Sequence, residues 1–249
     1  MSIKHTFFAP PEAVIDSTIS FSDSESHHAT RVLRVRTGDE VAVVDGEGNW
    51  YRVSVEVLGR KRVLGSILEH RSNVGEPGYH LTIGVGMLKN ATRFETFLEK
   101  AVELGVSQVI PLVTKRSEKS RIKKRRVETI LTSAMKQSGR SRRIRLDDPV
   151  KFKKWMKQRS LDNSECRAIC HEGASSDQNL ESALLNGRSK RKMVLLVGPE
   201  GGFTDEELDQ AAEKGFMVVS LGPRRLRTET AAIVSAATIM LSNYGEGTL

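Results

Sequence analysis

The sequence predicts an α/β protein in which a small all-β domain precedes a larger domain built on a parallel β-sheet. In residues 1–70, apolar residues recur at every second position between turn-rich segments, which is typical of short antiparallel strands. Beyond residue 80, short apolar runs alternate with amphipathic helical segments, and this alternation indicates a parallel sheet covered by helices on both faces. A chain of 249 residues can hold both domains.

The clearest element of the first domain is a hairpin. Residues 41–44 and 50–57 read as two strands, and the Gly-rich loop 45–49 joins them. A third strand is expected at 62–68, so the domain should form a small β-barrel or sandwich. The turn-rich segment 71–78 is the expected linker.

The second domain is expected to have buried strands at 80–88, 106–113, 167–171, 193–197 and 217–221. Segment 92–104 carries one apolar stripe at helical spacing, formed by Phe94, Phe97, Leu98, Ala101 and Val102, and Gly105 should end this helix. Segment 121–138 repeats the pattern up to Gly139, with Val127, Ile130, Leu131, Ala134 and Met135.

Charge is unevenly distributed along the chain. Residues 115–159 contain 18 Lys and Arg residues and four acidic residues, a surplus of +14, whereas the whole chain carries +8 and the remainder therefore −6. A single basic block on an otherwise acidic chain is typical of a surface that binds nucleic acid, because each neutralised phosphate releases counterions. A solvated helix face is the alternative, and Phe152, Trp155 and Met156 within the block should form the inner face of a basic helix.

Composition excludes several classes of protein. The sequence has no run of about 18 apolar residues, so no membrane span is expected. Residues 1–5 lack the apolar core of a secretory signal, and two cysteines are too few for a disulfide framework, which together point to the cytoplasm. Cys166, Cys170 and His171 lack the second ligand pair of an ordinary zinc site, so buried structural cysteines and no metal are expected.

The richest local motif runs from residue 195 to residue 208, where an apolar strand enters a Gly/Pro loop and a helix begins at once. Thr204 and Glu207 have the spacing of a capping box, with Phe203 and Leu208 at the staple positions. Glycines let backbone approach a ligand closely, and open α/β sheets bind ligands at the carboxyl ends of their strands. The loop lacks the Gly-Lys-Ser/Thr ending of a phosphate loop. A tight turn without a ligand is the alternative.

A second strand–loop–helix unit follows at 218–232. Thr228 is the expected N-cap, and Glu229 lies favourably in the first turn. The helix 230–241 is apolar almost all round, so it should be buried in the core or against a partner subunit. Two such loops from neighbouring strands would form a cleft lined by backbone groups, which suits a neutral adenosine that carries a sulfonium.

These motifs resemble the ribosomal RNA small subunit methyltransferase E family over nearly the whole chain. The resemblance rests first on the segments GPEGG at 198–202 and LGPRRLRTETA at 221–231. It continues in the HHATRVLR segment at 27–34, in ELGV at 103–106 and in QSGR at 137–140. The family makes 3-methyluridine in 16S rRNA and belongs to the SPOUT superfamily.

The resemblance implies a fold and a set of partners. It implies a PUA-like RNA-binding β-barrel at 1–72 and a SPOUT methyltransferase domain at 73–249 whose parallel sheet contains a deep trefoil knot. It also implies a homodimer that acts on 16S rRNA within the 30S subunit. Physical rules of chain topology alone would not predict a knot.

The resemblance further implies the site residues. The methyl donor, S-adenosylmethionine, would lie between two walls, made by Leu196, Val197, Gly198, Glu200, Gly201 and Gly202 and by Leu221, Gly222, Leu226, Thr230 and Ala231. The resemblance and the basic block together predict the residues that contact RNA. These are His28, Arg31, Arg34, Arg116, Lys123, Lys124, Arg125, Arg126, Arg140 and Arg142.

Methylation of uridine N3 requires loss of its proton near the moment of attack, and a cation can hold the charge that spreads onto the ring carbonyls. Arg227 is the candidate cation, and Glu229 is the candidate base or orienting group. Helix capping by Glu229 and structural pairing of Arg227 are the alternatives. Lys136, Ile144 and Arg225 depart from the family pattern, and Arg225 is expected to extend toward RNA. A ribose 2′-O-methyltransferase and a non-catalytic assembly factor remain the competing functions.

Overall fold

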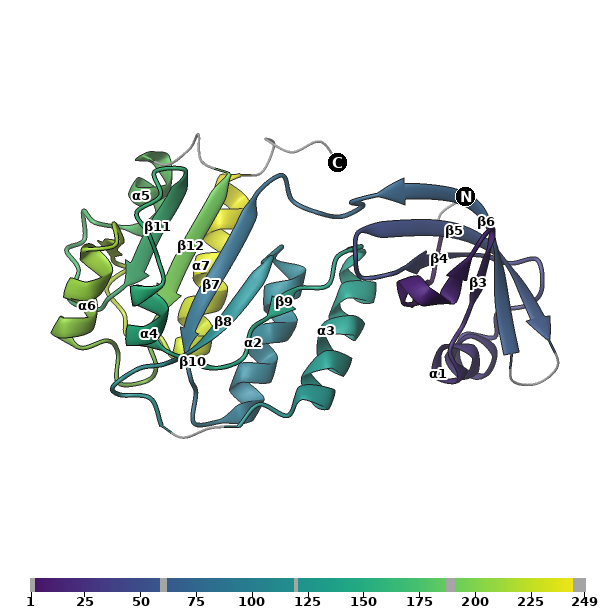
Figure 1. Cartoon of the computed structure of the whole chain (residues 1–249), viewed down its shortest axis with the longest axis horizontal. Coiled ribbons are helices and arrows are strands. Elements are labelled where there is room, and N and C mark those ends of the chain that lie inside the picture. Colours follow the sequence, from purple (N-terminus) through teal and green to yellow (C-terminus); the bar gives the residue numbers. More distant parts are fainter. Residues whose placement is uncertain (1–2, 59–61, 119–120, 187–190, 244–249) are drawn as a thin grey trace. The chain divides into compact units, whose positions relative to one another are not determined.

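The computed structural model in Figure 1 describes residues 3–58, 62–118, 121–186 and 191–243. The described chain divides into two compact units. The first contains the residues up to Glu76 together with Leu131–Arg143, and the second contains the remainder. A segment from the middle of the sequence therefore belongs to the N-terminal unit, which a single boundary after residue 72 does not anticipate.

The described part of the first unit forms a six-stranded sheet in the order β1-β4-β5-β6-β3-β2. Its strands are β1 (Thr6–Phe8), β2 (Val14–Ile15), β3 (Thr18–Ser20), β4 (Glu40–Val44), β5 (Asn49–Leu58) and β6 (Arg62–Ser72). The expected hairpin is confirmed, since β4 and β5 pair antiparallel from Val44 opposite Trp50 to Glu40 opposite Ser54. Phe7, Ile19 and Val53 lie fully buried in the core of this sheet. Between β3 and β4 lie a short helix, α1 (Asp23–His27), and a π-helical turn (His28–Val32).

The second unit is built on a parallel sheet in the order β10-β8-β7-β12-β11-β13, with β9 pairing β8. The strands are β7 (His80–Gly86), β8 (Gln108–Val113), β9 (Arg145–Leu146), β10 (Val150–Lys151), β11 (Glu165–Cys170), β12 (Lys192–Val197) and β13 (Met217–Val219). Every pairing recorded in this sheet is parallel, which confirms the predicted sheet type. Met193–Val197 are all buried, because helices cover both faces of the sheet.

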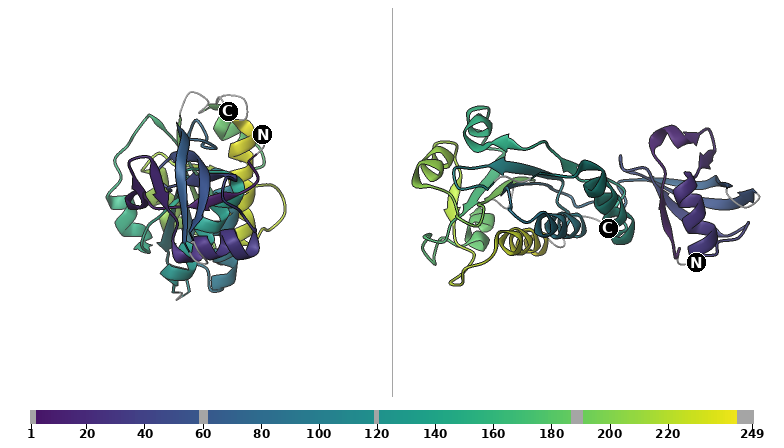
Figure 2. Two further views of the ribbon diagram at one scale, coloured as in Figure 1. Left: turned by 90° about the vertical axis from the view of Figure 1, so that its right-hand side faces the viewer. Right: turned by 90° about the horizontal axis from the view of Figure 1, so that it is seen from below.

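The helices are α2 (Ala91–Glu103), α3 (Lys124–Ser138), α4 (Phe152–Lys157), α5 (Leu180–Asn186), α6 (Asp205–Ala212) and α7 (Thr228–Ser242). In α2 the five residues of the predicted stripe are the buried ones, which confirms that prediction. Figure 2 shows α2 and α7 side by side on one face of the sheet. On α4, Phe152, Trp155 and Met156 are buried against Phe203 and Phe216, so they form an inner helix face as expected.

Helix α7 begins at Thr228, two residues before the predicted helix 230–241. Arg227 occupies the N-cap position and its side chain makes no capping hydrogen bond, whereas Thr228 is buried as the first helical residue. The prediction of Thr228 as N-cap is therefore wrong. Among the described helices, none is long and apolar enough to cross a membrane. The trefoil knot stays a prediction, because strand order and pairing do not specify how the loops thread.

Candidate functional site

The carboxyl ends of β11, β12 and β13 meet at one edge of the parallel sheet of the second unit. The glycine loop, residues 198–202, follows β12, and the loop 220–227 follows β13. The prediction that the two loop-bearing strands are neighbours is wrong, because β11 lies between β12 and β13 and pairs with both. The residues that follow β11 are therefore part of the same site.

The glycine loop is held from its C-terminal side by the start of α6. The Thr204 hydroxyl accepts a hydrogen bond from Glu207 N, and Glu207 Oε2 accepts one from Thr204 N at 3.0 Å, so the predicted capping box is confirmed. Glu207 also uses its second oxygen, Oε1, to accept a hydrogen bond from Lys115 N at 2.9 Å. The buried Glu207 thus ties the loop after β8 to the glycine loop.

Arg116, from the same loop after β8, also holds the glycine loop in place. Its Nη1 donates to the carbonyl oxygens of Gly201, at 2.8 Å, and Phe203, at 3.2 Å. Gly202 has φ of +70°, a left-handed conformation that favours glycine. Arg116 is one of the predicted RNA contacts, and in the structure its guanidinium lies against the glycine loop.

The glycine loop also packs directly on the end of β7. A Cβ atom on Gly86 would lie 2.3 Å from Pro199 N and 2.8 Å from Gly198 C, distances that no real Cβ contact tolerates. Gly86 was not among the predicted site residues. Gly86 ends β7, which pairs with β12, and this position would have marked it as a site residue. The pairing of β7 with β12 cannot be read from the sequence.

These loops enclose a cavity of about 260 Å³. Backbone and small or apolar side chains make up much of its lining, which comprises Arg116, Cys170, His171, Glu172, Val197, Gly198, Pro199, Glu200, Gly201, Gly202, Phe203, Ser220, Leu221, Gly222, Arg224, Arg225, Leu226, Thr228 and Ala231. Burial raises the pKa of the Cys170 thiol to about 12, so the thiol is neutral at physiological pH. A neutral thiol together with glycine and apolar residues suits an uncharged heterocycle.

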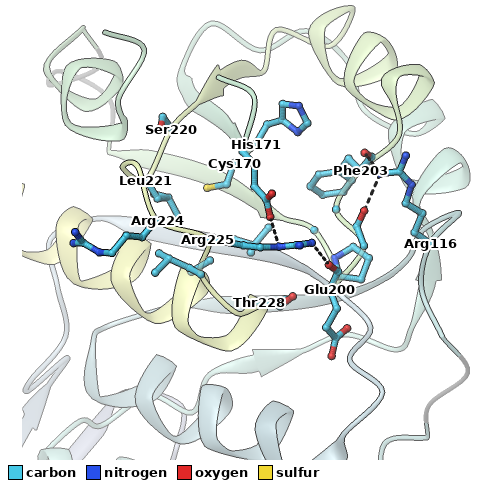
Figure 3. Close-up of a pocket in the computed structure, with 18 of the residues that line it drawn as sticks. Arg116, Cys170, His171, Glu200, Phe203, Ser220, Leu221, Arg224, Arg225 and Thr228 are labelled. Atoms are coloured by element: carbon cyan, nitrogen blue, oxygen red, sulfur yellow. Dashed lines mark hydrogen bonds and ion pairs between the residues drawn. The ribbon is translucent and has the colours of Figure 1, made fainter. Parts of the chain in front are cut away.

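Arg225 lies across the cavity (Figure 3). Its Nε is 3.1 Å from Glu172 Oε1, and its Nη2 donates to the Glu200 carbonyl oxygen at 3.5 Å. The side chain thus joins the loops that follow three strands, and its extension toward RNA stays a prediction.

Comparison with known proteins decides between the possible ligands of such a cavity. Residues 75–240 match the RNA methyltransferase domain family, and residues 21–68 match the RNA methyltransferase PUA domain. Over 231 residues the chain is 32% identical to the ribosomal RNA small subunit methyltransferase E of Synechocystis sp., covering 92% of this chain and 75% of that protein. The chain belongs to this methyltransferase family.

Solved structures agree with the family assignment. A probable rRNA-methyltransferase from Porphyromonas gingivalis superposes with a TM-score of 0.84 at 29% identity, covering 98% of this chain and all of that one. A ribosomal RNA small subunit methyltransferase E from Neisseria gonorrhoeae, bound to S-adenosyl methionine, superposes with a TM-score of 0.80 at 28% identity, covering 95% and 97% of the two chains. The predicted α/β methyltransferase fold with an N-terminal PUA domain is thereby confirmed.

Most of the donor residues implied by the family line the cavity. They are Val197, Gly198, Glu200, Gly201, Gly202, Leu221, Gly222, Leu226 and Ala231. Leu196 does not line the cavity, because its side chain is fully buried in the hydrophobic core. Thr230 is exposed on α7 and is also absent from the lining. The lining also contains Cys170, His171 and Glu172, which are not among the predicted donor residues. Nothing in their spacing along the sequence indicates that β11 lies between the two loop-bearing strands.

The two predicted catalytic residues, Arg227 and Glu229, lie at the start of α7, outside the cavity lining. Arg227 is exposed at the N-cap. Glu229 is turned toward α2, where its Oε1 lies 3.6 Å from Arg93 Nε. Arg93 Nη1 is also 3.9 Å from Glu200 Oε1, so Arg93 links the glycine loop to α7. Glu229 Oε2 is buried without a hydrogen-bond partner among the described residues.

Apart from Arg116, the candidate RNA contacts of the second unit lie at the start of α3. Lys123 and Arg125 are exposed. Lys124 pairs with Asp148 at 2.7 Å and Arg126 with Glu95 at 2.7 Å, so half of this cluster has a carboxylate partner.

In the first unit, His28, Arg31 and Arg34 are exposed on and after the π-helical turn. Arg142 is exposed and donates from Nε to Asn73 at 2.8 Å. The expectation of an RNA contact is wrong for Arg140, whose buried guanidinium pairs with Glu76 at 2.7 Å. Breaking a buried pair leaves an uncompensated charge, so Arg140 is a structural residue.

Proposed function

We propose that this protein is an S-adenosylmethionine-dependent methyltransferase that methylates N3 of a specific uridine in 16S rRNA. The observation that supports the donor is the cavity at the ends of β11, β12 and β13, where the family's glycine loop meets the loop 220–227. The matched RNA methyltransferase domain and PUA domain support the substrate class.

The residues present fit the proposed donor. Gly86 and Gly198 leave no space for side chains between the strand end and the glycine loop, so that loop can present backbone groups to a ligand. The Cys170 thiol, Leu221 and Ala231 offer uncharged contacts. When bound, S-adenosylmethionine supplies an electrophilic methyl group on a sulfonium, and a cavity that orients it contributes much of the rate.

The residues outside the cavity would act on the acceptor. Arg227, exposed at the N-cap of α7, would hold the negative charge that develops on the uridine carbonyl oxygens. Glu229 would act as an orienting group rather than as a base, because its carboxylate faces Arg93 on α2. The first unit would bind RNA through His28, Arg31 and Arg34. The protein would work in the cytoplasm as a homodimer, on rRNA within the 30S subunit.

Nucleoside mass spectrometry tests this function. Purified protein is incubated with S-adenosylmethionine and 30S subunits from cells that lack the corresponding modification, and the 16S rRNA is digested to nucleosides. We expect one new 3-methyluridine per subunit. A ribose-methylated nucleoside would instead identify a 2′-O-methyltransferase. No new product together with no donor binding in calorimetry would identify a non-catalytic assembly factor.

A further inference from the structure

Three arginines line the described cavity, and their side chains differ in the contacts that they make. Arg116 donates to the carbonyl oxygens of Gly201 and Phe203, so it is committed to the glycine loop. The Arg224 guanidinium points away from Arg225 in Figure 3. Arg225 lies across the cavity and is therefore the cation best placed to meet a ligand inside it.

The present partners of Arg225 are exchangeable. Its ion pair with Glu172 at 3.1 Å joins side chains that are 73% and 65% exposed. Its other contact, with the Glu200 carbonyl oxygen, is long at 3.5 Å. An ion pair this exposed contributes little to stability, because solvent screens it and two long side chains lose freedom in forming it. A second carboxylate could replace Glu172 at little cost.

The proposed donor carries one such carboxylate, on its methionyl end. Resting on the proposed function, we propose that Arg225 recognises the carboxylate of S-adenosylmethionine and that Glu172 is the competitor displaced when the donor binds. The guanidinium suits this exchange because its planar donors match both oxygens of a carboxylate. Arg225 would then determine specificity for a donor that has an intact amino-acid end.

Calorimetry with two ligands isolates this contact, because decarboxylated S-adenosylmethionine differs from the donor only in that group. A hydrogen-bonded charge contact predicts that the wild-type protein prefers S-adenosylmethionine by roughly 10- to 100-fold. Arg225→Leu should abolish the preference, and Arg225→Lys should restore part of it. Arg224→Leu is the matched control, since it removes one neighbouring positive charge, and it should keep most of the preference.

Glu172→Gln gives a change of the opposite sign. Removing the competing carboxylate should increase affinity for S-adenosylmethionine and leave affinity for the decarboxylated ligand unchanged. If Glu172→Gln weakens binding of both ligands as much as Arg225→Leu does, the pair is a structural clamp and the inference is overturned. Equal wild-type affinity for the two ligands overturns this inference alone, whereas binding of neither ligand overturns the proposed function as well.

Discussion

At the scale of single residues, the position of the glycine loop depends on the absence of a side chain at Gly86. A Cβ atom on Gly86 would lie 2.3 Å from Pro199 N, so the loop could not pack where it does. Arg116 donates to the Gly201 carbonyl oxygen, and Glu207 accepts a hydrogen bond from Thr204 N directly after the loop. These contacts within the protein position the loop, and such preorganisation lowers the cost of ligand binding.

Gly86→Ala should therefore displace the glycine loop. Overpacking of this kind costs about 1–3 kcal/mol of stability, and the accompanying shift of Pro199 and Gly198 should weaken donor binding measured by calorimetry. Gly84→Ala on the same strand is the matched control, because its Cβ would meet the side-chain ends of Leu196 at 2.6 Å and Leu112 at 2.9 Å rather than loop backbone. The control should lower the thermal midpoint and keep donor affinity. Unchanged affinity in a folded Gly86→Ala protein would contradict this account.

At the scale of elements, local patterns predicted well and sheet order did not. The apolar stripe of α2, the β4–β5 hairpin and the capping box of α6 all follow from interactions within about ten residues. The insertion of β11 between β12 and β13 depends on crossovers that no local pattern specifies. Consequently the glycine motifs identified two walls of the site, while Cys170, Glu172 and Gly86 remained hidden.

The pairing of charges was equally inaccessible to sequence analysis. Arg140 lies in the basic block and matches a family motif, yet Glu76, far from it in the sequence, holds it in a buried pair. Lys136, which departs from the family pattern, pairs with Glu25 at 2.5 Å in the same unit. Composition counts such residues as available positive charge, whereas only tertiary contacts show which of them are neutralised.

Helix α7 supports an element-scale prediction about assembly. Val234 and Leu241 lie seven residues apart, hence on one helix face, and are 38% and 66% exposed. Light scattering should give twice the chain mass of 27.6 kDa for the wild-type protein. Val234→Lys combined with Leu241→Lys should shift the mass to that of one chain, because it places charges in an apolar contact. Leu161→Lys, at a residue that is 71% exposed on a loop, should leave the dimer intact. A wild-type mass of one chain would exclude the dimer.

At the scale of the whole molecule, the uneven charge separates two tasks. The block 115–159 carries a surplus of 14 positive charges, while the rest of the chain sums to −6. The acidic remainder limits non-specific attraction of polyanions to other surfaces, and the basic block would concentrate RNA near the exposed cations. The structure refines this argument, because Lys124 and Arg126 already face carboxylates whereas Lys123 and Arg125 are exposed beside them.

This arrangement predicts that two double variants at the start of α3 differ in the salt dependence of RNA binding. If Lys123 and Arg125 contact phosphates, replacing both with Ala should lower the slope of log affinity against log salt concentration by about 2, since each phosphate contact contributes about 1. Lys124→Ala with Arg126→Ala removes the same formal charge but frees Asp148 and Glu95, so any effect should be a uniform weakening with a smaller change in slope. RNA-binding titrations at several salt concentrations distinguish the two. Equal slopes for both variants and the wild type would mean that this cluster is only solvated, and RNA binding would then depend on the exposed cations of the first unit.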